Sequence, residues 1–238
     1  MGVLSFRPMR TNPIIVALDL PSLDRSIALA RELSPFVGCF KVGLELLTAE
    51  GVPRVLERFA AEKLPVFADV KFSDIPNTVA GATEAVTRYP IEFFDVHASC
   101  GRKSVEMAAQ KKGKAKLLAV TVLTSIESQE CETLFGSTPE KKVLELARMA
   151  QESGADGVVC SPWELGILSG LELIKVTPGI RPSWAAQQDQ KRALSPKEAL
   201  ARGADYLVIG RPITKPGGGL SPRDAVQKIL SEIGWSAS

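Results

Sequence analysis

The sequence has little histidine and cysteine, and neither residue type is grouped. His97 is the one histidine among 238 residues, and the four cysteines lie far apart without a Cys-x-x-Cys pair. This spacing excludes a histidine-rich metal centre and argues against a zinc site or a disulfide scaffold. It leaves open a Mg²⁺ site built from carboxylates alone, with Asp19, Asp69 and their neighbours as ligands.

The sequence also lacks an excess of one charge and a long apolar run. The formal net charge is +2, and the basic residues are scattered, so a nucleic-acid-binding face is not indicated. No apolar stretch is long enough to span a bilayer, and the first residues lack the apolar region of a secretory signal. We therefore expect a cytoplasmic protein that binds neither nucleic acid nor membrane.

Eight short apolar runs recur along the chain, and amphipathic stretches separate them. Most runs are continuously apolar, which is typical of parallel strands covered on both faces. They span residues 14–20, 39–42, 66–71, 93–98, 117–123, 157–161, 174–177 and 206–210.

Helix signals follow several of these runs. Ser22 is placed to cap a helix over residues 23–33, and residues 53–61 have apolar positions at helical spacing. Pro139 can open a helix over residues 139–153, and Ser195 begins a capping box with Glu198. The alternation predicts a single (β/α)8 barrel domain over residues 1–238. An open doubly wound sheet is the alternative, although no Gly-x-Gly-x-x-Gly follows the first strand.

Polar residues stand at the ends of the predicted strands, where the active site of such a barrel lies. They are Asp19, Lys41, Asp69, Lys71, Asp95, His97, Thr121, Thr124 and Arg211. A single Asp–Lys pair could be a structural ion pair at the rim. Charges on several adjacent strands favour a functional cluster, because unpaired charges inside a barrel are costly. We expect His97 to be a structural, hydrogen-bonded residue beneath the site, with a general base as the alternative.

Two further segments carry chemistry. The run Asp69-Val70-Lys71-Phe72-Ser73-Asp74 has two carboxylates around one lysine, and the Ile75-Pro76-Asn77-Thr78 that follows leads into a helix, where Asp74 and Thr78 could also be simple caps. Arg181, two residues after Gly179, and Arg211, directly after Gly210, follow the last two strands, where these barrels often bind phosphate. For either arginine alone, a surface salt bridge is the alternative.

Together these segments resemble the orotidine 5′-phosphate decarboxylase family. The resemblance rests on Val16-Ala17-Leu18-Asp19, Lys41-Val42-Gly43, the whole 69–78 run, Thr177-Pro178-Gly179-Ile180-Arg181-Pro182 and Val208-Ile209-Gly210-Arg211-Pro212. It covers residues 12–233. The Asp-x-Lys-x-x-Asp pattern alone also occurs in related sugar-phosphate barrels, but its combination with the other segments is much more specific.

The resemblance implies that the chain converts orotidine 5′-phosphate to UMP and CO₂, without a cofactor or metal. Lys71 would donate the proton to C6 of the ring, Asp69 would lie against the leaving carboxylate, and Asp19 and Lys41 would contact the ribose. Thr124 would approach the pyrimidine, while Arg181, Gln190, Gly210 and Arg211 would hold the phosphate. A homodimer is implied, with Asp74, Ile75 and Thr78 completing the site of the other subunit.

The chemistry of the residues agrees with this expectation. Loss of CO₂ from an sp² ring carbon leaves a carbanion, and an ammonium fixed beside it can stabilise and then protonate it. That ammonium needs carboxylate neighbours to stay charged away from water, and Asp69 and Asp74 are the nearest in sequence. Two alternatives remain: a Mg²⁺-dependent sugar-phosphate decarboxylase or aldolase-type synthase, and a non-catalytic nucleotide sensor.

Overall fold

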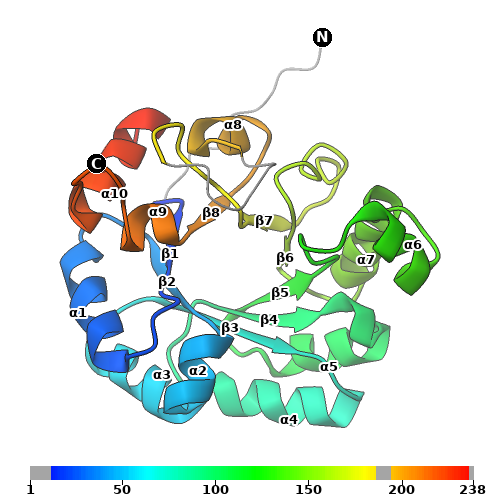
Figure 1. Cartoon of the computed structure of the whole chain (residues 1–238). Coiled ribbons are helices and arrows are strands. Elements are labelled where there is room, and N and C mark those ends of the chain that lie inside the picture. The colour runs from blue at the N-terminus through cyan, green and yellow to red at the C-terminus, as the bar shows by residue number, and fades with distance from the viewer. Residues whose placement is uncertain (1–11, 186–193, 236–238) are drawn as a thin grey trace.

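A computed structural model describes residues 12–185 and 194–235 of the chain. Eight parallel strands form a closed barrel in sequence order, and helices surround it (Figure 1). β1 (Ile14–Ala17) pairs on one side with β2 (Cys39–Val42) and on the other with β8 (Tyr206–Ile209). The pairing of Ile15 with Val208 closes the ring, so the barrel prediction is confirmed and the open sheet is wrong.

The remaining strands and the helices follow the expected alternation. The strands are β3 (Val66–Phe72), β4 (Phe93–His97), β5 (Lys116–Val120), β6 (Gly157–Val159) and β7 (Ile174–Thr177). The helices are α1 (Leu23–Leu33), α2 (Leu44–Glu50), α3 (Val52–Ala61), α4 (Pro76–Val86), the 3₁₀ turn η1 (Ala98–Cys100), α5 (Arg102–Lys111), α6 (Ser128–Phe135), α7 (Pro139–Glu152), α8 (Pro196–Ala201), α9 (Arg211–Thr214) and α10 (Pro222–Ile233).

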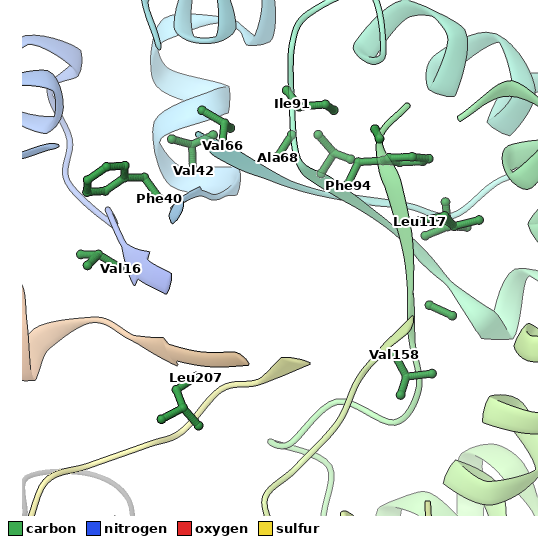
Figure 2. Close-up of a cluster of buried hydrophobic side chains, with 14 of the residues drawn as sticks. Val16, Phe40, Val42, Val66, Ala68, Ile91, Phe94, Leu117, Val158 and Leu207 are labelled. Atoms are coloured by element: carbon green, nitrogen blue, oxygen red, sulfur yellow. The ribbon is translucent and has the colours of Figure 1, made fainter. Parts of the chain in front are cut away.

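Two apolar layers hold the barrel together. Inside it, side chains such as Ile15, Phe67 and Val208 form a small cluster. Outside it, a much larger cluster fills the space between strands and helices, and Figure 2 shows Val16 and Phe40 among the side chains that point away from the barrel. Because neighbouring residues of a strand face opposite ways, these continuously apolar strands supply both layers.

Local signals explain where the helices begin. The Ser22 hydroxyl accepts the Arg25 N–H at the start of α1, and Ser195 and Glu198 form the capping box of α8. These two predictions and the helices near 53–61 and 139–153 are confirmed. The predicted strands over 14–20 and 117–123 extend too far, because buried residues such as Leu18 and Val122 leave the sheet while staying apolar.

The connection between β6 and β7 has no regular helix within its described residues and instead makes turns over residues 162–170. Leu165 and Leu168 anchor these turns in the outer apolar layer. Among the residues that the structure describes, no helix has the length and apolar character needed to cross a membrane.

Candidate active site

A pocket of about 230 Å³ opens at the carboxyl ends of the strands. Its charged lining comes from β2 and β3 and consists of Lys41, Asp69 and Lys71. Apolar and small side chains from β3, from other strands and from the loops after them complete the lining: Phe67, Val120, Val122, Leu123, Thr124, Val159, Cys160, Pro178 and Val208. The pocket therefore places two ammonium groups against a largely apolar wall, where electrostatic interactions are weakly screened.

Alternating carboxylates and ammonium groups form one connected network in this pocket. The Nζ of Lys41 lies 3.1 Å from Oδ1 of Asp19 and 2.9 Å from Oδ2 of Asp69. The other oxygen of Asp69 contacts Nζ of Lys71, which also lies 2.9 Å from Oδ2 of Asp95. Each ammonium thus lies between two carboxylates, so both lysine side chains are held in place. The structure brings together Asp19, Lys41, Asp69 and Lys71 as the sequence predicted.

Asp95 also fixes the backbone of Lys71. Lys71 has a φ of +53°, in the left-handed region that a residue with a side chain rarely adopts. Its N–H donates to Oδ1 of Asp95 at 2.8 Å, and the pairing of β3 with β4 shifts register between Ala68 and Phe72. A strained backbone of this kind persists where its surroundings enforce it, often at a functional site. The bulge turns the lysine toward the pocket, which a regular strand period alone does not ensure.

Gly43 gives the Lys41 ammonium its room. A Cβ on this residue would lie 2.9 Å from Nζ of Lys41 and 3.4 Å from Oδ1 of Asp19. The φ of Gly43 is −104°, so the backbone itself would accept another residue. Space beside the network, rather than backbone conformation, is therefore the requirement for glycine here.

His97 ends β4 but, among the described residues, is not one of those that line the pocket. Burial and the positive charge of Lys71 lower the pKa of His97, so the ring is neutral at pH 7. Its structural role stays a prediction. Within residues 12–185 and 194–235, no three His, Cys, Asp or Glu side chains are grouped so that they could hold a metal ion.

The structure does not bring Asp74, Ile75 and Thr78 into this pocket. Asp74 is exposed, its Oδ1 accepts the N–H of Ile75 at 2.7 Å, and its backbone C=O accepts the Ser104 hydroxyl. Within the chain Asp95, not Asp74, is the second carboxylate beside Lys71, and the expectation that Asp74 completes the site of the other subunit stays a prediction. Sequence proximity misleads here because the chain turns away into α4 after Phe72.

The predicted phosphate residues lie on the loops after β7 and β8. The N–H of Arg181 donates to the C=O of Leu194, so the loop closes on itself at this point. A Cβ on Gly210 would lie 3.5 Å from Cβ of Ala17 and 3.9 Å from Oδ2 of Asp19, which places this backbone beside the charged network. Arg211 follows at the start of α9. Gln190 lies outside the described residues, whereas Thr124 lines the pocket as expected.

Comparison with known proteins is consistent with this geometry. Residues 12–229 match the model of the "Orotidine 5'-phosphate decarboxylase / HUMPS family". The chain belongs to this family. It is 44% identical to the orotidine 5′-phosphate decarboxylase of Nostoc sp. (strain PCC 7120 / SAG 25.82 / UTEX 2576), over 94% of this chain and 98% of the relative. It is 43% identical to the one from Chromohalobacter salexigens, over 94% and 98%.

A solved structure of a family member gives the same architecture. The crystal structure of orotidine 5′-phosphate decarboxylase from Lactobacillus acidophilus is similar with a TM-score of 0.78, at 36% identity, covering 94% of this chain and all of that one. The family resemblance inferred from the sequence motifs is confirmed.

Proposed function

We propose that the chain decarboxylates orotidine 5′-phosphate to UMP without a cofactor, and that Lys71 donates the proton that replaces the carboxylate. The overall reaction, the last step of de novo UMP synthesis, follows from membership of the family and from relatives that bear this name over nearly their whole length. The observation that supports the role of Lys71 is its position between Asp69 and Asp95 at the pocket.

The proposed reaction needs no electron sink in the ring. The bond between C6 and the carboxylate carbon breaks, CO₂ departs, and the electron pair stays on C6. The Lys71 ammonium stabilises this charge and transfers a proton from Nζ to C6, after which the neutral amine regains a proton from water. Preorganised charge of this kind stabilises a transition state strongly, because little reorganisation is needed during the reaction.

The neighbouring groups have separate proposed roles. Asp69 lies against the leaving carboxylate, and Asp19 and Lys41 bind the ribose hydroxyls, while Thr124 approaches the pyrimidine. The network that joins Asp19, Lys41, Asp69 and Lys71 supports this division, since a ligand that contacts one member meets the others in a fixed arrangement. The apolar wall of Val120, Val159 and Val208 excludes water from the reacting carbon.

The phosphate is proposed to bind between the loops after β7 and β8. Arg181 and Arg211 would supply charged donors, Gly210 would allow the backbone to approach the phosphate closely, and Gln190 would close over it. Distant binding energy of this kind can contribute to catalysis at the ring, because it orients the substrate.

A homodimer is proposed, with Asp74, Ile75 and Thr78 completing the site of the other subunit. Ile75 is 67% exposed, and Asp74 and Thr78 are exposed beside it at the start of α4. A large apolar side chain flanked by polar ones suits an interface with a second copy. Mixing inactive Lys71→Ala and Asp74→Ala enzymes tests this proposal. After equal mixing about half of the dimers are hybrids, and each hybrid contains one intact site out of two, so at most about a quarter of all native sites would be regained. No regain would contradict a shared site.

The direct test of the function follows the ultraviolet absorbance of orotidine 5′-phosphate with EDTA present. We expect turnover that EDTA does not change. Loss of activity with EDTA would instead favour the Mg²⁺-dependent sugar-phosphate enzyme, and no turnover at all would favour a nucleotide sensor.

A cytoplasmic location stays a prediction.

A further inference from the structure

A buried carboxylate lies just behind the apolar wall of the pocket, where the proposed mechanism does not use it. Glu164 is on the connection that follows β6, and it is only 9% exposed. The next residue, Leu165, is fully buried in the outer apolar layer, whereas Trp163 is half exposed. Glu164 therefore points inward with its apolar neighbour.

The Glu164 side chain turns back to the point where the sheet ends. The last sheet-like bond of this segment joins the Cys160 N–H to the C=O of Val176 at 3.1 Å. The next N–H, that of Ser161, donates to Oε2 of Glu164 at 2.7 Å, and the Glu164 N–H donates to the Ser161 C=O at 3.0 Å. Glu164 thus replaces the neighbouring strand as the acceptor for the first residue beyond the pocket wall.

That wall belongs to the active site. Val159 and Cys160 line the pocket, and β6 lies opposite β2, the strand of Lys41, in the ring of eight strands. Ser161 follows Cys160 directly, so a shift of the Ser161 amide would move the wall against which the substrate ring packs. A displacement of about 1 Å at such a position can lower a rate a hundredfold.

Stability does not explain a carboxylate at this place. Burial raises the pKa of Glu164 to about 7, and the charge of Glu140 on α7 adds to this effect, whereas the Ser161 N–H opposes it. Burial raises the pKa of Cys131 on α6 and of Cys160, and the charge of Glu164 adds to both shifts. At neutral pH the protein therefore holds a partly ionised buried group, which a neutral side chain would avoid.

We propose that Glu164 is a positioning residue of the decarboxylase, which fixes the Ser161 amide and thereby the Val159–Cys160 wall of the substrate pocket. This inference rests on the proposed function, because it assigns the residue to the same pocket. Its role is exerted through the backbone contact, and a side chain that keeps the acceptor oxygen keeps the role.

Two substitutions separate positioning from packing. Glu164→Leu keeps the bulk and removes the acceptor, whereas Glu164→Gln keeps an oxygen for the Ser161 N–H. Asp224→Ala is the matched control, because Asp224 accepts the Ser221 N–H in the same way at the exposed start of α10. For each variant we would measure kcat and KM with orotidine 5′-phosphate, the Kd of UMP, and hydrogen exchange of the peptide that contains Cys160 and Ser161.

Glu164→Leu is expected to lower kcat/KM on the order of tenfold, to weaken UMP binding and to speed exchange at Ser161. Glu164→Gln should restore all three, and Asp224→Ala should leave kcat/KM within about twofold of the native value. Native kcat/KM and native exchange in Glu164→Leu would overturn the proposal, as would a Gln variant as impaired as the Leu variant. If the native enzyme did not turn over orotidine 5′-phosphate, the proposed function would fail, and exchange at Ser161 would still test the contact.

Discussion

Asp95 holds Lys71 at two points. Its Oδ1 accepts the backbone N–H of Lys71 at 2.8 Å, and its Oδ2 lies 2.9 Å from Nζ of the same residue. Asp95 is fully buried in β4, and its carboxylate forms an ion pair with Lys71. The contact fixes both the left-handed backbone and the direction of the ammonium, which makes Asp95 the residue that positions the proposed proton donor.

Asp95→Asn is expected to lower kcat about a hundredfold while KM changes little, because the amide can still accept the backbone N–H but cannot pair with the ammonium. Steady-state kinetics and UMP binding check this. Asp156→Asn is the control, since Asp156 makes the same two contacts, to the Leu117 N–H and to Lys112, at the opposite end of the barrel. An equal loss of kcat in both variants would show a general effect on folding.

Gly43→Ala is expected to lower kcat/KM about tenfold or more while the fold is retained, because the added methyl displaces the Lys41 ammonium from Asp19 and Asp69. Gly170→Ala is the control, since a Cβ there meets no atom within 4 Å. Kinetics and thermal unfolding of both variants check this. Native kinetics in Gly43→Ala would show that the network tolerates the displacement.

Arg211→Ala is expected to lower kcat/KM, because a charge-assisted phosphate contact is lost. The decrease should correspond to a loss of several kcal/mol of transition-state stabilisation. The nucleoside orotidine has no phosphate, so its much slower reaction should be equally fast in the native and variant enzymes. A parallel loss with orotidine would place Arg211 elsewhere in the site.

Glu164 is expected to make the free energy of unfolding fall as pH rises. Its pKa of about 7 in the folded protein exceeds the ordinary value of 4.5, so the folded state binds the proton more tightly than the unfolded state. This contribution is complete below pH 4.5 and is lost by pH 7, a change of about 3 kcal/mol. Glu164→Gln should remove this part of the pH dependence in urea unfolding, and an unchanged profile would contradict the raised pKa.

The sequence was most informative where one residue type determines the outcome. Continuous apolar runs predicted the strands, and Ser195 with Glu198 predicted the start of α8. Asp95 was recognised as a polar residue at a strand end but not as a partner of Lys71, because that contact depends on how β3 and β4 align. The register shift in β3 determines this alignment, and no local pattern marks it.

Asp74 shows a limit of sequence spacing. It stands three residues after Lys71, yet the turn into α4 directs it to the surface, and its expected place in the site of the other subunit stays a prediction. The apolar wall was also missed, because residues such as Val159 and Val208 look like any core residue in the sequence. Only the closure of the barrel shows which core residues face a pocket.

The proton donor is tested most directly by the Lys71→Ala enzyme at saturating orotidine 5′-phosphate, with UMP binding measured on the same sample. We expect turnover to fall below detection while the protein stays folded and binds UMP, with a lower melting temperature because buried Asp95 loses its ammonium partner. Decarboxylation at a rate close to that of the native enzyme would contradict the role of Lys71.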